Sequence, residues 1–151
     1  MASMLKIMVF ILLVLGSYST ISLALTNDRI IVESSNGLAI SGYDPVSYHL
    51  DEAPRLGDKN IETVWKGVIW TFATPTNQAA FIDNPEYYTP AFGGYDPTSV
   101  AEGRLTSGNP LIWAKNDEKI YFFFSAKKRD LFMSNPEIYV NKSEEIWPEL
   151  N

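Results

Sequence analysis

The chain has 151 residues, a formal net charge of −6 and no cysteine. An acidic surface repels phosphate backbones, so the composition argues against a nucleic-acid partner. Without cysteine the chain can form neither a disulfide nor a thiolate site, so its stability must come from packing, to which four tryptophans contribute.

The N-terminal residues have the pattern of a secretory signal peptide. Residues 1–6 carry one lysine, residues 7–15 form an unbroken apolar run, and Ser22 and Ala24 are the small residues that a signal peptidase recognises. We expect cleavage after Ala24 and a periplasmic or secreted protein. The alternative is an uncleaved membrane anchor, but the apolar run is well short of the roughly 20 residues that span a bilayer. The sequence therefore predicts a signal peptide over 1–24, one domain over 25–151 and no stable membrane span after cleavage.

Short strands alternate with short helices in the mature part. Residues 30–32 are predicted to form a short strand, and Asp44-Pro45 is predicted to open a helix that ends near residue 50. The segments 61–66 and 68–73 flank Gly67 as a hairpin, and a helix is expected from 74 through 81. A second hairpin (111–114 and 120–124), a helix from Ser125 through 133 and a last short helix from about 136 follow. This order predicts an α+β fold, in which a small antiparallel sheet of two hairpins packs with short helices.

The strand–helix pattern occurs twice. Ile-Trp-Thr-Phe at 69–72 recurs as Ile-Tyr-Phe-Phe at 120–123, and Asn-Pro-Glu at 84–86 recurs at 135–137, both at an offset of 51 residues. Gly-Tyr-Asp-Pro occurs at 42–45 and again at 94–97. Unrelated strand–helix units can use the same turn residues, but the shared register favours two related halves. Two units suit a two-layer domain better than a solenoid, which needs at least three repeats.

The segment 87–103 concentrates glycine, proline, tyrosine and acidic residues, and we expect any function to reside there. Asp96 in this segment and Asp44 occupy equivalent places in the two Gly-Tyr-Asp-Pro motifs. They form either a carboxylate pair, for a hard cation or for acid–base chemistry, or two helix N-caps, and we favour the caps. Glu102 is either a third oxygen ligand or the polar end of a short helix stopped by Gly103. Tyr95 either lines an aromatic pocket or belongs to the core.

His49 is the only histidine, which excludes a multi-histidine metal site. As a catalytic base it would need an orienting acid and a nucleophile, and Ser47, two residues away, would lie on a different side of a helix. A packed or surface position fits His49 better. The glycine pair at 93–94 lacks the following lysine and the spacing of a phosphate-binding loop. No catalytic constellation is evident, so we predict a protein that is not an enzyme.

Several segments, in this order along the chain, resemble the YHS-domain family. They are Ala-Ile-Ser-Gly-Tyr-Asp-Pro-Val-Ser-Tyr at 39–48, Trp-Thr-Phe at 70–72, Asn-Pro-Glu-Tyr-Tyr-Thr-Pro-Ala-Phe-Gly-Gly-Tyr at 84–95, Ala-Glu-Gly at 101–103 and Trp-Pro at 147–148. The resemblance covers nearly the whole mature chain and implies an exported single-domain protein. Larger relatives attach such domains to metal-handling proteins, and the family is therefore suspected of binding heavy metals such as copper.

The chain departs from this family at one position. Family members usually carry Tyr-Cys after the glycine pair, and that cysteine is the family's best candidate metal ligand, whereas this chain carries Asp96. A thiolate at a helix N-terminus suits Cu(I), while a carboxylate is a hard ligand. The family's presumed route to copper is therefore not available to this chain.

From the residues and the resemblance we expect an exported, non-enzymatic YHS-like binding module. Its ligand would be an unknown small molecule or a divalent metal ion near Asp96, with Tyr95, Glu102, His49 and Asp44 as candidate neighbours; no other cofactor is predicted. One alternative is a structural or interaction protein with an exported partner and a decayed site. The other is a carboxylate-dependent enzyme in which Asp44, Asp96 and His49 share a cleft.

Overall fold

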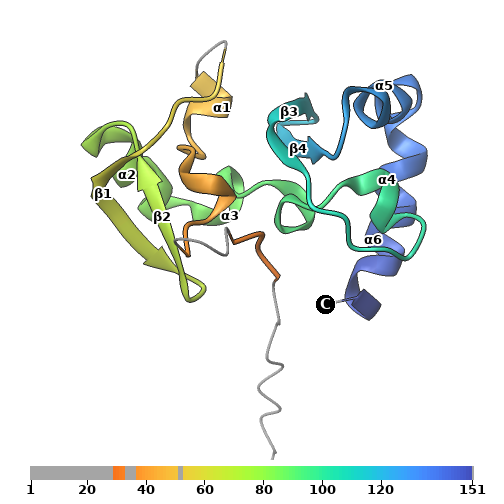
Figure 1. Ribbon diagram of the computed structural model, residues 1–151, viewed down its shortest axis with the longest axis horizontal. Coiled ribbons are helices and arrows are strands. Elements are labelled where there is room, and N and C mark those ends of the chain that lie inside the picture. Colours follow the sequence, from red (N-terminus) through yellow and green to blue (C-terminus); the bar gives the residue numbers. More distant parts are fainter. Residues whose placement is uncertain (1–28, 33–36, 51–52, 151) are drawn as a thin grey trace, which may run out of the picture.

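The computed structural model describes residues 29–32, 37–50 and 53–150. The fold is α+β, as predicted, with antiparallel hairpins packed against short helices (Figure 1). The described elements are η1 (Ile40–Gly42), α1 (Ser47–Leu50), β1 (Asp58–Trp65), β2 (Val68–Phe72), α2 (Pro75–Asp83), α3 (Pro85–Tyr88), η2 (Ala91–Gly94), α4 (Pro97–Val100), β3 (Asn109–Asn116), β4 (Lys119–Phe123), α5 (Ala126–Ser134) and α6 (Pro136–Leu150). The signal peptide expected over 1–24 lies outside the described residues. Within them, no helix combines the length and the apolar character needed to cross a membrane.

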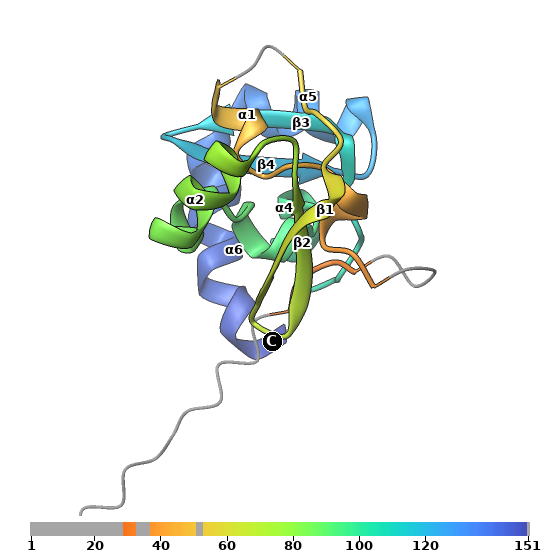
Figure 2. The same cartoon turned by 90° about the vertical axis from the view of Figure 1, so that its left-hand side faces the viewer.

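The two halves inferred from the repeated sequence have equivalent structures. Shifting the bounds of β1, β2 and α2 by 51 residues gives those of β3, β4 and α5. The register irregularities recur as well, between Asp58 and Glu62 in the first hairpin and between Asn109 and Trp113 in the second. Each hairpin forms its own two-stranded sheet in the described part of the chain. Figures 1 and 2 show α2 beside the β1–β2 hairpin. The next helix, α3, lies between the halves and contacts α2 and β4.

Local turn chemistry explains where the longer helices begin. Thr74 caps α2 by accepting a hydrogen bond from the Asn77 N–H, and Ser125 caps α5 by accepting one from the Lys128 N–H. These two caps occupy equivalent positions, with one residue between each cap and the end of β2 or β4. In both halves, therefore, a hydroxyl side chain after the second strand of the hairpin caps the helix that follows.

Two elements differ from the prediction. The strand expected at 30–32 is a single bridge between Val32 and Ala39. The backbone groups of Ile31 bond to two different segments. The Ile31 N–H donates to the Gly93 carbonyl (2.9 Å), and the Ile31 carbonyl accepts from the Ile40 N–H (3.2 Å). The last helix, α6, is longer than expected, with 15 residues. It packs against α4 and is fixed there by the buried Ser143 hydroxyl, which donates to the Pro97 carbonyl at 2.7 Å.

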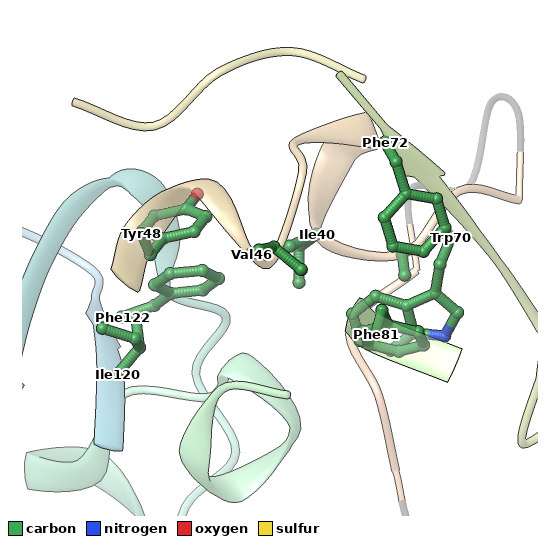
Figure 3. Packing of buried hydrophobic residues seen from close by; sticks show 9 residues of the cluster. Ile40, Val46, Tyr48, Trp70, Phe72, Phe81, Ile120 and Phe122 are labelled. Carbon is green, nitrogen blue, oxygen red and sulfur yellow. The ribbon is translucent and has the colours of Figure 1, made fainter. Parts of the chain in front are cut away.

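A shared hydrophobic core holds the halves together. Figure 3 shows Trp70, Phe72 and Phe81 of the first half joined through Ile40 and Val46 to Tyr48, Ile120 and Phe122 at the second hairpin. A smaller cluster contains Tyr121, Phe123 and Phe132. Since side chains alternate along a strand, β4 sends Ile120 and Phe122 into the shared core and Tyr121 and Phe123 toward α5 and α6. The β4 strand is therefore sandwiched between two apolar layers.

Asp96 connects the second hairpin to the helix turn that precedes it. Its side chain is fully buried. One carboxylate oxygen accepts from the Thr98 N–H (2.8 Å) and the Thr98 hydroxyl (2.7 Å), and the other accepts from the Phe124 N–H (2.8 Å). The first oxygen is the N-cap of α4, which confirms the cap interpretation. The second oxygen reaches the end of β4, a contact that the sequence did not indicate.

Asp44 makes the equivalent connection in the first half. It too is fully buried. Its Oδ1 accepts from the Val46 N–H (2.8 Å), while its Oδ2 accepts from the Ala73 N–H (2.8 Å) and the Asn77 side-chain amide (2.6 Å). Ala73 follows β2 as Phe124 follows β4, so each half uses a buried aspartate to join a helix turn to a strand end.

We predict that Asp96→Ala lowers the free energy of unfolding by about 2–4 kcal/mol, because it removes an N-cap and leaves a buried donor without an acceptor. Asp44→Ala should lose a similar amount. In Asp96→Asn the single side-chain oxygen can accept from only one of the two sets of donors, and the amide NH₂ group faces the other set. The loss of unfolding free energy should therefore be intermediate. Urea denaturation at pH 7 measures all three.

The matched control is Asp130→Ala, since the Asp130 carboxylate is exposed and pairs with the neighbouring Arg129. If Asp96→Ala and Asp130→Ala lower the free energy of unfolding by the same amount, the role given to Asp96 is contradicted.

Candidate functional site

A pocket of about 180 Å³ lies against the segment 87–103, called the glycine-rich loop below. Its lining comes from both halves and from the segments between them: Arg29, Ile30, Trp65, Lys66, Glu86, Thr89, Pro90, Ala91, Phe92, Gly93, Lys119 and Trp147. Five of these twelve residues belong to the stretch 89–93, inside the loop where the sequence placed any function. The loop therefore contributes a large part of the lining of this pocket.

The loop wall of the pocket has a fixed backbone shape. Phe92 and Gly93 both have positive φ angles (52° and 59°) inside η2. At Gly93 no other residue fits, because a Cβ there would lie 1.7 Å from the Arg29 carbonyl oxygen. The hydrogen bond from the Ile31 N–H to the Gly93 carbonyl holds the N-terminal segment against this wall. The glycine thus allows two backbone segments to meet at the pocket.

Two lysines from different hairpins converge at the same residue of the pocket. The Lys66 ammonium lies 3.0 Å from the Glu86 carboxylate, and the Lys119 ammonium donates to the Glu86 backbone carbonyl at 2.9 Å. Lys66 comes from the β1–β2 turn and Lys119 from the start of β4. Since α3, which carries Glu86, lies between the halves, the pocket brings the two charges together although 53 residues separate them.

Aromatic side chains form the apolar part of the pocket. Trp65, Phe92 and Trp147 all line it. The Phe92 and Trp147 rings pack edge to face with centroids 5.7 Å apart, and the Lys66 ammonium lies 4.4 Å from the centre of the Trp65 ring. The α6 helix supplies Trp147, so its unexpected length matters for the site.

The described lining of the pocket contains both cationic and anionic side chains. Among the described residues, the charged side chains of the lining are those of Arg29, Lys66, Lys119 and Glu86. The whole chain carries a net charge of −6. Charged side chains beside aromatic walls can bind a small ligand that has both a polar group and an apolar body.

The predicted site residues do not come together at this pocket. Asp44 and Asp96 are buried in separate halves, where each accepts hydrogen bonds from backbone and side-chain donors. Glu102 is exposed and pairs with Arg104 and, at 3.8 Å, with Lys128. Among the five predicted residues only Tyr95 approaches the pocket, with its ring centroid 6.1 Å from that of Trp147.

The described residues offer no gathering of three His, Cys, Asp or Glu side chains suited to a metal ion. The donors around Asp96 are N–H and O–H groups, which satisfy the carboxylate oxygens but are not metal ligands. The enzyme hypothesis required Asp44, Asp96 and His49 to share one cleft, and the structure gives the two aspartates separate capping roles instead. The arrangement that this hypothesis requires is therefore not found in the part of the chain that the structure describes.

His49 is packed, which is one of the two positions, packed or surface, that the sequence favoured. Its ring lies against Tyr87 and Tyr88, with centroid distances of 4.8 and 5.3 Å. Neither ring nitrogen has a hydrogen-bond partner among the described residues. Burial of the ring, together with the nearby positive charge of Lys115, lowers the pKa of His49 to about 4. The imidazole is therefore neutral near pH 7 and contributes to packing between α1, α3 and the β3–β4 turn.

A second hollow, of about 440 Å³, lies between the β3–β4 turn and α6. Lys119 lines it as well, but the other charged residues are Asp117, Glu137 and Glu144. Burial and the two carboxylates of Glu144 and Asp117 raise the pKa of Tyr121 in this hollow to about 12. Among the described residues, the second hollow is therefore lined by more carboxylates than the first.

Comparisons of the chain with protein-family models, with curated proteins and with solved structures gave no match. Among the pocket residues outside the loop, Glu86 and Trp147 belong to motifs that the sequence analysis singled out, but these motifs did not indicate a pocket. Arg29, Trp65, Lys66 and Lys119 share no motif or spacing. The one usable signal was the loop itself, whose glycines and prolines indicated a shaped surface.

The pKa of His49 predicts a specific dependence of stability on pH. The folded-state value of about 4 lies below the ordinary 6.5, so the folded state resists protonation. The stability associated with the neutral ring is therefore fully present above pH 6.5 and is lost as the pH falls from 6.5 toward 4. His49→Phe keeps an aromatic ring between the tyrosines and should show a smaller loss over this range.

Unfolding free energies of the wild type and of His49→Phe, measured by urea denaturation from pH 7 to pH 4, test this prediction. Comparison of the two proteins cancels the contribution of the carboxylates, which titrate in both. We expect the stability difference to shift in favour of His49→Phe as the pH falls. Parallel pH profiles would show that His49 has the same pKa in the folded and unfolded states.

Proposed function

We propose that the protein is an exported, non-enzymatic binding module of the YHS type, and that its ligand is a small molecule held in the pocket beside the glycine-rich loop. The observation that carries this proposal is the convergence of both hairpins, the loop and α6 on one hollow that has charged and aromatic walls. Ligand sites typically combine such apolar walls with a few convergent polar groups, and they occur where structural units meet.

The rigidity of the loop supports the proposal. Gly93 admits the close approach of the Arg29 backbone, and Asp96 ties the helix turn after the loop to the end of β4. A pocket whose wall is fixed before binding loses less conformational entropy when a ligand enters. Export is proposed from the signal-peptide pattern of residues 1–24, and the YHS type is proposed from motifs that include those at 39–48 and 84–95.

Metal binding near Asp96 receives no support from the described geometry, so the small-molecule version is favoured. In this proposal Asp96 acts on the ligand only indirectly, by fixing the loop and the strand end. The structural or interaction protein is one alternative, and it differs in one respect: it needs no small molecule in the pocket.

The test is a fragment library of mixed charge, followed through the indole N–H signals of the four tryptophans in NMR spectra. We expect some fragments to shift the signals of Trp65 and Trp147, which line the pocket, and to leave that of Trp113 unchanged. The same fragments should raise the melting temperature, because a ligand that binds only the folded state stabilises it.

The variant Trp147→Ala removes one wall of the pocket and should abolish these shifts at Trp65, while Phe124→Ala, at an exposed aromatic side chain away from the pocket, should not. A library in which no fragment affects Trp65 or Trp147 would contradict the proposal. Co-purification with one exported protein would then favour the interaction alternative.

A further inference from the structure

We infer that the second hollow, between the β3–β4 turn and α6, is a binding site for a small linear diamine that lies along α6. This site is separate from the pocket of the proposed function and does not depend on it. The inference follows from four properties of the described lining: its charge, a buried hydroxyl without a partner, the spacing of its carboxylates and its volume.

The charge of the hollow favours a cation. The charged side chains of its described lining are three carboxylates and one ammonium, those of Asp117, Glu137, Glu144 and Lys119. The ion pairs of the described chain involve other acidic residues, so none of these three carboxylates is paired there with a lysine or an arginine. Lys119 donates to the uncharged Glu86 carbonyl and keeps its charge. The carboxylates therefore outnumber the ammonium by two, which a doubly charged cation would balance.

A buried hydroxyl in this hollow lacks a hydrogen-bond partner. Tyr121 is only 5% exposed, and its ring packs against that of Phe132 with centroids 4.9 Å apart. Its hydroxyl forms no hydrogen bond within the described part of the chain, although buried polar groups normally have a partner. Tyr121 lines the hollow together with Glu144 and Asp117, whose charges add to burial in raising its pKa to about 12. The hydroxyl is therefore neutral at pH 7, and its oxygen can accept from an ammonium group.

The carboxylates are spread along the hollow. Four residues of the lining lie on one face of α6, since they occur at positions i, i+3, i+4 and i+7: Glu137, Val140, Asn141 and Glu144. Glu137 and Glu144 are separated by about two helical turns, or roughly 10 Å along the axis. A single compact ion would not contact both, and the described residues contain no group of three His, Cys, Asp or Glu that could hold a metal.

A linear diamine matches this spacing. One ammonium group would lie at Glu144, Asp117 and the Tyr121 hydroxyl, and the other would lie toward Glu137. The apolar chain between them would pass over Val140, which lies between the two glutamates on the same face of α6.

The volume of the hollow accommodates such a ligand. A cavity of about 150 Å³ is enough for benzene, and the hollow holds about 440 Å³. Its apolar lining is limited to Pro136, Val140 and the Tyr121 ring, beside the amides of Asn116 and Asn141. This lining suits a slim aliphatic chain with polar ends better than a bulky apolar cation.

Putrescine, a four-carbon diamine, is the probe for this class, and butylamine and butanediol are its singly charged and neutral matches. We expect putrescine to shift the NMR signals of the Asn116 and Asn141 side-chain amides and of the Tyr121 backbone amide. It should bind about fivefold more tightly than butylamine, because its second ammonium forms a further, partly exposed ion pair. Butanediol should bind most weakly, and rising ionic strength should weaken putrescine binding. The indole signal of Trp65, which lines only the first pocket, should not shift.

Variants make the same test from the protein side. Glu144→Gln and Tyr121→Phe should each weaken putrescine binding by about threefold, since each removes one contact to an ammonium group. Glu137→Gln should weaken it less, because the N-terminus of α6 partly offsets the Glu137 charge. The matched control is Glu145→Gln, the next residue on α6, which is exposed and outside the lining. It removes the same charge as Glu144→Gln and should leave the affinity unchanged.

Four outcomes would overturn the inference. The first is butylamine that binds as tightly as putrescine, and the second is Mg²⁺ that shifts the same signals with equal affinity. The third is an equal loss of affinity in Glu144→Gln and Glu145→Gln, which would show a general attraction of cations to an acidic surface. The fourth is putrescine that shifts none of these signals. Each would leave the proposed function intact, because fragments in the first pocket are followed separately through Trp65 and Trp147.

Discussion

The structure depends on two buried carboxylates that connect segments far apart in the sequence. Asp44 joins the turn before α1 to the end of β2, and Asp96 joins the start of α4 to the end of β4. Each half is a small hairpin with short helices, and a two-stranded hairpin alone is at best marginally stable in water. A carboxylate that accepts from both a helix turn and a strand end fixes their relative position, which the apolar side chains then cover.

This connection places the pocket. Once Asp96 holds α4 against β4, the loop that precedes it must run between the halves, and the shared core at Ile40, Val46 and Phe122 brings the first hairpin to its other side. Lys66 and Lys119 then meet at Glu86, although neither lysine is close to the other in sequence. The pocket therefore results from the packing of two halves with the same order of elements. The residues that line it do not occupy equivalent positions in the two halves.

The sequence predicted what local chemistry determines. Thr74 and Ser125 mark helix starts, Gly67 marks the first hairpin turn, and the two Gly-Tyr-Asp-Pro motifs reveal both the repeat and the caps. It did not predict contacts that require the folded chain. The second oxygen of Asp96 reaches an N–H that lies 28 residues away, and the length of α6 depends on its packing against α4. The pocket lining was missed for the same reason, since five chain segments contribute to it without a common spacing.

Amide hydrogen exchange at Phe124 tests the central role of the buried aspartates most directly. The Phe124 side chain is 63% exposed, yet its N–H donates to the buried Asp96 carboxylate at 2.8 Å. If this bond holds the second half together, the Phe124 amide opens only when the half unfolds, and it should exchange about as slowly as the amides in the middle of β4. Exchange of the Phe124 amide at the rate of an exposed loop amide would contradict the account.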